Sequence, residues 1–366
     1  MSASARKVGI VGGGQLARML ALAGYPLGLQ FKVLDPAPDA CAGQVAGLIQ
    51  GAYDDPLALA ELAEWADVIT FDFENVPAAA AQALTQQTAV YPPPSALATA
   101  QDRLNEKTLF GELNIPTPRF ANVLEFADLQ QASAHTGLPA VLKTRRLGYD
   151  GKGQRVLHSE ADLAPAYTAL GDAPLILEGF VKFEREVSIL AIRDRNGHID
   201  FYPLTENQHQ AGILHLSLAP YENMSLSLQA QDYARRVAQQ LDYVGVLAIE
   251  FFVVQGQLLA NEMAPRVHNS GHWTIEGAET SQFENHLRAI CGLPLGSTQA
   301  RGYSAMLNCI GTMAARDNCL AVTGAHYHDY GKQARSGRKV GHVTVRSDTP
   351  ANRQQQLKTL QTATDL

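Results

Sequence analysis

The sequence predicts a multidomain protein that joins an α/β unit to α+β units. Strand-like and helix-like runs alternate through residues 1–94, which is typical of a parallel sheet. Three consecutive prolines, Pro92–Pro94, then end regular structure and mark a boundary. Beyond them, apolar runs flank glycine-containing turns, which indicates antiparallel hairpins. A chain of 366 residues exceeds one typical core, so we expect more than one domain.

The composition narrows the class of protein. A hydrophobic fraction of 46% with 18% charged residues is ordinary for a globular enzyme. The net charge of -7 argues against a general nucleic-acid or membrane-surface binder. The four cysteines form no CxxC pair, which predicts reduced thiols rather than disulfides or a zinc site. With no signal-peptide pattern and no transmembrane-length apolar run, we expect a cytoplasmic protein.

The first strand, Val8–Val11, runs into a glycine turn and a helix. Gly12, Gly14 and Ala17 satisfy the pattern G-x-G-x-x-A. A second strand, from residue 30 to residue 34, ends at Asp35, where an acid could hold a ribose hydroxyl. These features predict a Rossmann-like parallel sheet and favour NAD binding at first sight. The alternative is that any tight strand-to-helix turn needs such glycines and can hold any phosphate.

The same alternation continues to the proline boundary. Residues 57–65 and 78–84 read as helices, and residues 67–71 and 89–91 read as strands. Glu74 lies just past the end of the strand at 67–71, where open α/β sheets place ligands. Glu74 could equally be a helix cap or a solvated loop acid.

The middle of the chain carries a glycine-rich loop. Residues 95–113 read as one helix, in which Arg103 and Lys107 share a face, either toward a ligand or toward solvent. A strand then ends at Lys143, and the loop from Gly148 to Gln154 leads into a return strand at 155–157. Glycines let the backbone approach a ligand, and successive N–H groups with nearby lysines bind anions. The loop is therefore either a flap over nucleotide phosphates or a flexible hairpin tip.

Further acids follow strand-like runs. Glu178 comes directly after the strand at 175–177, where a carboxylate beside exposed backbone suits an adenine ring. Glu186 falls in an alternating strand and could accept from ribose hydroxyls. The strand at 201–209 ends at His209, and residues 227–241 read as a helix.

The most informative block is a predicted hairpin between residues 244 and 264. Glu250 and Glu262 lie six residues on either side of Gly256, so antiparallel pairing places them opposite each other. Facing carboxylates among apolar residues are unfavourable unless a hard cation binds them, and Mg²⁺ is the usual one. Arg266 shares the face of Glu262, because strand side chains alternate. His268 and Asn269 follow in a polar, glycine-containing run that reads as a substrate loop.

In this order the motifs resemble those of ATP-grasp enzymes. The runs Asn261–Trp273 and Tyr330–His342 resemble more specifically the N5-carboxyaminoimidazole ribonucleotide synthetase family of purine biosynthesis. The resemblance extends from Val8 to about Val345. It implies a Rossmann-like pre-ATP-grasp domain (1–94), a central ATP-grasp domain (95–295) with the flap within 143–157, and a small C-terminal β-rich domain (296–366). It also implies a homodimer that binds neither nucleic acid nor membrane.

The resemblance implies a reaction as well. ATP phosphorylates bicarbonate to carboxyphosphate and leaves as ADP. The exocyclic amine of 5-aminoimidazole ribonucleotide then attacks carboxyphosphate, or the CO₂ released from it, and phosphate is the second product. Many ATP-grasp enzymes have Asn two residues after the second metal-binding Glu; here that position is Ala264, so water or substrate is expected to complete the metal shell.

The resemblance assigns residues to each ligand. ATP is expected to meet Arg103, Lys143, Gly148, Tyr149, Asp150, Gly151, Lys152, Gly153, Gln154, Glu178, Gly179, Phe180, Val181, Glu186, His209, Asn261 and Glu262. Mg²⁺, or Mn²⁺ in its place, is expected on Glu250 and Glu262. Bicarbonate and the ribonucleotide are expected at Gln15, Glu74, Tyr149, Asp150, Arg266, His268, Asn269, Lys332, Arg335, Arg338 and Lys339. Lys143, Asp150, Arg266 and His268 are the expected catalytic residues, with Asp150 orienting the amine or accepting its proton.

Three alternatives stay open at this point. An NAD-dependent dehydrogenase would use the glycine turn but would leave the carboxylate hairpin unexplained. A formate-dependent glycinamide ribonucleotide transformylase shares the ATP-grasp motifs, and only the basic segment at 330–342 argues against it. A non-catalytic ATP-binding module is disfavoured because Lys143, Glu250, Glu262 and Arg266 are all present. The tail after Val345 has no readable chemistry.

Overall fold

The computed structural model describes residues 6–148, 153–364 and 366. The N-terminal unit is a parallel sheet with the strand order β3-β2-β1-β4-β5. Its strands are β1 (Lys7–Val11), β2 (Gln30–Asp35), β3 (Gly47–Gln50), β4 (Val68–Phe71) and β5 (Ala89–Val90). Its helices are α1 (Gln15–Gly24), α2 (Pro56–Trp65) and α3 (Ala78–Leu84). The Rossmann-like expectation is confirmed, and β3 is the strand that the sequence reading missed.

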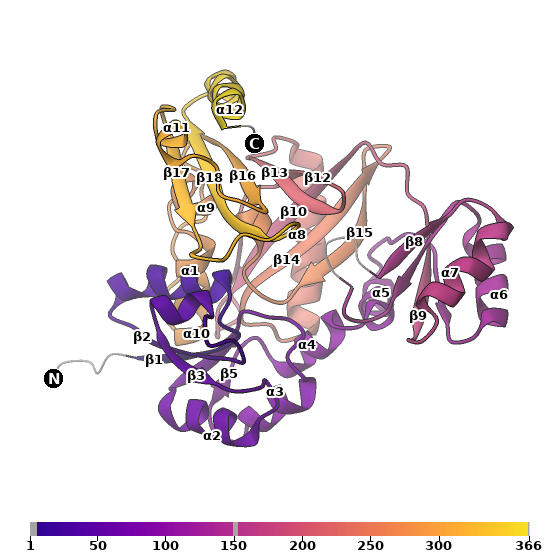
Figure 1. Ribbon diagram of the computed structural model, residues 1–366, viewed down its shortest axis with the longest axis horizontal. Helices are drawn as coiled ribbons and strands as arrows, with labels where there is room; N and C mark the ends of the chain where they lie inside the picture. Colours follow the sequence, from indigo (N-terminus) through magenta and orange to yellow (C-terminus); the bar gives the residue numbers. More distant parts are fainter. Residues whose placement is uncertain (1–5, 149–152, 365) are drawn as a thin grey trace.

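A small antiparallel sheet forms a separate lobe with the order β6-β9-β7-β8. It contains β6 (Phe120–Val123), β7 (Ala140–Thr144), β8 (Gln154–Leu157) and β9 (Leu175–Gly179), covered by α6 (Phe126–Thr136) and α7 (Leu163–Leu170). Figure 1 shows this lobe on the right, joined to the body of the molecule beside α5. Val141 pairs with Glu178 across β7 and β9, so Lys143 and Glu178 lie diagonally on one face.

A long sheet with the order β15-β14-β10-β12-β13-β16-β18-β17 forms the body, and β11 pairs with β10. Its strands are β10 (Arg185–Arg193), β11 (Ile199–Phe201), β12 (Thr205–Gln210), β13 (Ile213–Ala219), β14 (Gly245–Val254), β15 (Gln257–Ala264), β16 (Tyr303–Ile310), β17 (Ala325–Asp329) and β18 (Lys339–Ser347). The accompanying helices are α8 (Met224–Gln240), α9 (Thr274–Gly277), α10 (Gln282–Cys291), α11 (Arg316–Leu320) and α12 (Pro350–Thr364). Leu216 of β13 pairs with Leu307 of β16, so one sheet continues into the C-terminal unit.

The N-terminal sheet and the body share a core. Leu20 of α1 and Leu287 of α10 are both fully buried in one apolar cluster that also contains Val246 of β14. This packing fixes the glycine turn of the first unit against the long sheet. None of the helices in the described ranges has the length and apolarity needed to cross a membrane.

Two expected elements are wrong. The expected helix at 95–113 is two helices, α4 (Pro94–Ala100) and α5 (Arg103–Glu112), because Asp102 adopts extended backbone and caps α5 through the Leu104 N–H. The expected strand at 201–209 is divided between β11 and β12, with Pro203 between them, which has no N–H for a ladder.

Candidate active site

The hairpin of β14 and β15 brings the two predicted carboxylates together. Glu250 and Glu262 are direct cross-strand partners, as predicted. The route to this pairing differs from the expectation. The turn pairs Val254 with Gln257, and this register carried onward would place Asn261 opposite Glu250. A β-bulge next to Glu250 adds one residue to β15, and so brings Glu262 into place.

The two carboxylates have unequal charges. Burial, together with the charge of Glu262, raises the pKa of Glu250 to about 7. Burial also opposes ionisation of Glu262, but the charges of Arg103 and Lys143 outweigh it and lower the pKa of Glu262. Arg103 Nη1 lies 3.1 Å from Glu262 Oε2. Paired hard oxygen donors, one of which holds its proton near neutrality, fit a divalent cation.

His268 lies beside this pair but is not its counter-ion. His268 Nε2 is 3.6 Å from Glu250 Oε1. Burial, with the nearby charge of Arg266, lowers the pKa of His268 to about 3, so the ring is neutral at physiological pH. A neutral imidazole can donate or accept one hydrogen bond toward a ligand.

Glu178 lies between two lysines, Lys107 of α5 and Lys143 of β7. Lys143 Nζ lies 2.9 Å and Lys107 Nζ lies 3.8 Å from Glu178 Oε2. Burial opposes ionisation of Glu178, but the charges of Lys107 and Lys143 hold its pKa at about 2. The second oxygen, Oε1, is buried with no hydrogen-bond partner among the described residues. An acceptor left in this state fits the amino group of an adenine ring.

Other predicted nucleotide residues lie on or beside the two antiparallel sheets. His209 Nδ1 contacts Glu186 Oε2, and although burial lowers the pKa of His209, this bond and nearby carboxylates raise it overall. Gly148 O accepts from Arg103 Nη2 at 3.3 Å. Gly179 ends β9, and Phe180 and Val181 follow it. Gly153 lies just before β8, which begins at Gln154. The flap residues Tyr149, Asp150, Gly151 and Lys152 lie outside the described residues.

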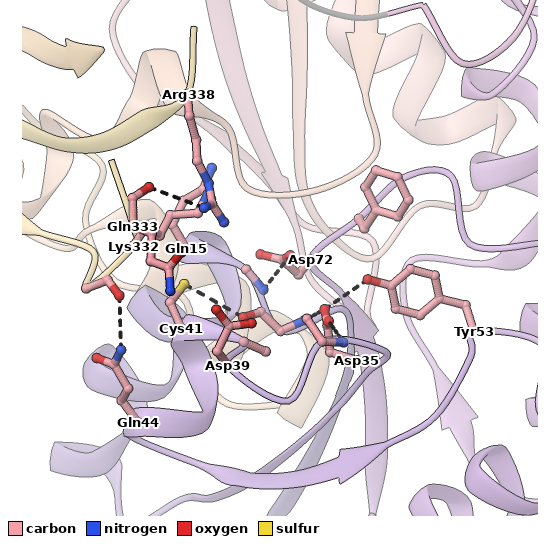
Figure 2. A pocket seen from close by; sticks show the side chains of 16 residues that line it. Gln15, Asp35, Asp39, Cys41, Gln44, Tyr53, Asp72, Lys332, Gln333 and Arg338 are labelled. Carbon is pink, nitrogen blue, oxygen red and sulfur yellow. Dashed lines mark hydrogen bonds between the residues drawn. The ribbon is translucent and has the colours of Figure 1, made fainter. Parts of the chain in front are cut away.

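A hollow lies against the glycine turn of the N-terminal sheet. It has a volume of about 490 Å³, and its wall comes from that turn, the ends of β2 and β4, and the segment at 331–338. Figure 2 shows Arg338 and Lys332 reaching toward the glycine turn from the C-terminal segment, with Tyr53 and Asp35 at the opposite end. Lys332 Nζ donates to Gln15 Oε1 at 2.6 Å across 317 residues of sequence. The structure thus brings together the predicted residues Gln15, Lys332 and Arg338.

Two other basic candidates lie elsewhere. Arg335 is exposed and is not part of the wall of this hollow. Lys339 begins β18 and acts electrostatically on Glu250 and His268, so it belongs to the neighbourhood of the carboxylate pair.

The glycine turn is held by two carboxylates rather than left open for a pyrophosphate. Asp72 accepts from Gly14 N at 3.0 Å and from Ala17 N at 2.8 Å, and Asp35 accepts from Gly13 N at 2.7 Å. A side chain at Gly14 would begin 2.5 Å from Asp72 Oδ2. Three N–H groups at this turn are thus already used by carboxylates, which disfavours the first-sight reading of an NAD site.

The sequence reading missed Asp72, Tyr53 and Cys41, which line the hollow. Asp72 carries a usable signal, because it follows β4 directly and so lies at the carboxyl edge of the sheet. Asp35 Oδ2 accepts from Tyr53 at 2.9 Å as well as from Gly13 N. Asp35 therefore supports the turn and is not held in place for a ribose hydroxyl.

Arg266 joins the two halves of the site. Its Nε contacts Glu74 Oε2, although Glu74 follows β4 and Arg266 follows β15. Burial opposes the ionisation of both groups, but each favours the charged form of the other: the pKa of Glu74 is lowered and that of Arg266 is raised. Asn269 lies nearby, with its amide paired to the amide of Asn308 at 3.0 and 2.8 Å.

Three family models match successive parts of the chain. They are the ribonucleotide synthetase preATP-grasp domain (residues 5–101), the ATP-grasp domain (residues 108–283) and the phosphoribosylaminoimidazole carboxylase C-terminal domain (residues 304–356). The N5-carboxyaminoimidazole ribonucleotide synthase of Pseudomonas aeruginosa is 57% identical over 340 residues, covering 93% of this chain and 94% of that protein.

This chain belongs to the N5-carboxyaminoimidazole ribonucleotide synthase family. Solved structures agree. The synthetase of this family from Thermus thermophilus is 56% identical, with a TM-score of 0.94, covering 97% of this chain and 98% of that chain. The family member from Aspergillus clavatus, in complex with ADP and 5-aminoimidazole ribonucleotide, is 32% identical, with a TM-score of 0.92 and 98% of each chain covered. The expected family, fold class and ATP-dependent ligase class are confirmed.

Proposed function

We propose that this chain uses ATP and bicarbonate to carboxylate the exocyclic amine of 5-aminoimidazole ribonucleotide, giving N5-carboxyaminoimidazole ribonucleotide, ADP and phosphate. The observation that carries the proposal is the Arg266–Glu74 contact, which places a carboxylate-pair cleft and a basic hollow on either side of one ion pair. The relative from Aspergillus clavatus, with ADP and the ribonucleotide bound, shares this fold over 98% of the chain.

The region between the two antiparallel sheets, here called the cleft, is assigned to ATP. Glu178 Oε1 accepts from the adenine amino group, and the Glu186–His209 pair faces the ribose. Lys143 and Arg103 neutralise phosphate charge, and the flap from Gly148 to Gln154 covers the phosphates and excludes water from a hydrolytically fragile intermediate. Val181, Gly179, Phe180 and Asn261 form the remaining wall.

Glu250 and Glu262 are assigned to Mg²⁺, with Mn²⁺ as a substitute. When bound, the ion supplies positive charge against the phosphate oxygens. In the described part of the chain, no group of three or more His, Cys, Asp or Glu side chains is arranged to hold a metal. Mg²⁺ is commonly bound by one or two carboxylates with substrate phosphates and water, which the facing pair allows.

The reaction is assigned to the region around the Arg266–Glu74 contact, where the two halves of the site adjoin. A bicarbonate oxygen attacks the γ-phosphorus, the bond to ADP breaks, and carboxyphosphate forms. The exocyclic amine then attacks the carboxyl carbon of carboxyphosphate, or of CO₂ released from it, and phosphate leaves. Arg266 donates hydrogen bonds to the bicarbonate oxygens, neutral His268 orients them, and Asp150 is the candidate that takes the amine proton. Tyr149, Asn269 and Lys339 are assigned to the aminoimidazole.

Metal binding is expected to depend on pH through Glu250. In the absence of metal, Glu250 holds a proton below about pH 7, and the cation must displace it. Affinity therefore rises with pH, and between about pH 8 and about pH 6 it should fall about tenfold. Titration of Mn²⁺ into the nucleotide-free protein measures this. Glu250→Gln should bind weakly with no such pH dependence, and an unchanged slope in that variant would assign the titration to another group.

The hollow at the glycine turn is assigned to the ribonucleotide phosphate, with Lys332 and Arg338 as its cations and Gln15 as their neighbour. Arg338→Ala should raise the KM for the ribonucleotide about tenfold to a hundredfold, because it removes a charge-assisted hydrogen bond. The KM for ATP should change little. Arg335→Ala is the matched control, since this exposed arginine on the same loop does not line the hollow. Equal effects of the two substitutions would contradict the assignment.

Three further expectations belong to this proposal. We place domain limits at 94/95 and 295/296, although the long sheet continues across the second limit. We expect a homodimer, which light scattering on the purified protein tests. We expect a cytoplasmic location, which the four buried thiols support.

A further inference from the structure

Helix α5 covers the outer edge of β15, the edge strand of the long sheet. The Met263 N–H donates to Glu106 Oε1 at 2.6 Å. Lys107 Nζ donates to Ala260 O at 3.3 Å and contacts Asn261 O. Both side chains are well shielded, since Glu106 is 2% and Lys107 is 0% exposed. An acidic and a basic side chain on adjacent helical residues thus satisfy backbone groups that an edge strand would leave unpaired.

These contacts fall at the bulge and nowhere else along β15. Between the turn and the bulge, the outward N–H groups belong to even-numbered residues: Leu258 N donates to Gln229 Oε1 and Ala260 N donates to Pro116 O. Beyond the bulge, the outward N–H belongs to Met263, an odd-numbered residue. Lys107 donates to the carbonyl groups of Ala260 and Asn261, on the turn side of the bulge. Glu106 accepts from the Met263 N–H on the other side.

We propose that Glu106 and Lys107 fix the bulge and thereby position Glu262 opposite Glu250, so that α5 assembles the divalent-cation site. The inference rests on the proposed metal role of the carboxylate pair. Without the bulge, the register set by the turn would place Asn261 opposite Glu250 and turn Glu262 to the other face. Glu106 and Lys107 are therefore positioning residues, and neither needs to touch a substrate.

Lys107 also links β15 to the lobe formed by the small antiparallel sheet. Lys107 Nζ also lies 3.8 Å from Glu178 Oε2 on β9, which is an ion-pair contact rather than a third hydrogen bond. One turn earlier on α5, Arg103 spans from Glu262 to Gly148 O. The same helix therefore sets the distance between the carboxylate pair and the adenine end of the cleft.

The test compares Glu106→Leu with Glu106→Gln, which are similar in size but differ in whether an acceptor oxygen remains for Met263 N. The readouts are Mn²⁺ binding in the presence of ADP, followed by electron paramagnetic resonance, and hydrogen exchange of the Met263 amide. Glu106→Leu should weaken Mn²⁺ binding about tenfold or more, as expected for a residue that supports a metal ligand. Its Met263 amide should exchange faster, while ADP binding in EDTA stays close to that of the parent. Glu106→Gln should retain near-parent metal binding.

Glu262→Gln separates this inference from the metal assignment. If Glu262→Gln leaves Mn²⁺ binding unchanged, the carboxylate pair is not the metal site and both proposals fall. If Glu262→Gln weakens binding while Glu106→Leu binds Mn²⁺ like the parent, the positioning inference alone is overturned. Should Glu106→Leu not fold, Lys107→Met removes the contacts to Ala260 O and Asn261 O and is judged by the same comparison with Glu262→Gln.

Discussion

Replacing Glu262 with alanine should lower the rate of ADP formation about a thousandfold or more, because the loss of several kcal/mol of charge stabilisation corresponds to such a factor. Glu262 is paired with Arg103 at the mouth of the cleft and its side chain is 43% exposed, so its removal leaves the apolar core intact. The rate of ADP release with saturating MgATP, bicarbonate and ribonucleotide measures the effect, and circular dichroism confirms the fold.

A surface glutamate provides the control for this substitution. Glu279 is 46% exposed in its side chain and is paired with Arg301 away from the cleft, so Glu279→Ala should behave like the parent. Near-parent ADP formation by Glu262→Ala would refute the metal role of the carboxylate pair. A matching loss in Glu279→Ala would show that the assay reports stability rather than chemistry.

Replacing Arg266 should separate ATP binding from carboxylation. Arg266→Met removes the guanidinium and leaves Glu74 as a partly buried carboxylate without its counter-ion. Product formation should fall at least about a hundredfold, as when a preorganised donor is lost from an active site. The free energy of unfolding should fall by about 1–3 kcal/mol, because Glu74 in a partly buried, hydrogen-bonded pair loses its charged partner. The affinity for ADP should be retained.

Arg266→Lys distinguishes a chemical role from a structural one. Lysine keeps a positive charge for Glu74, so most of the stability should return, but it lacks the planar, multiple donors of arginine. The rate of carboxylation should therefore stay low. If rate and stability return together in Arg266→Lys, the role of Arg266 is only to neutralise Glu74.

Part of the geometry of the candidate nucleotide site follows from local sequence patterns. Lys143 and Glu178 each end a strand of one small sheet, and strand pairing alone brings them to 2.9 Å. The facing of Glu250 and Glu262 was also predicted, but through symmetry about Gly256. The actual register depends on a bulge held by α5, which lies about 150 residues earlier and which no local pattern in the hairpin encodes.

Long-range contacts explain most of what the sequence left open. Gln15 and Lys332 are 317 residues apart, so the basic segment could be named as a phosphate site but not located. The glycine turn suggested a dinucleotide because its glycines make room for Asp72, which comes from another strand. The helix expected at 95–113 breaks because the capping bond of Asp102 outweighs helical continuity.

The most direct test of the whole account is the rate of ADP formation from MgATP as each co-substrate is supplied or omitted. Full rate should require both bicarbonate and 5-aminoimidazole ribonucleotide, since the Arg266–Glu74 contact joins the two halves of the site. Formate with glycinamide ribonucleotide should not support it. ADP formation that depends on formate and glycinamide ribonucleotide, and not on bicarbonate, would contradict the account.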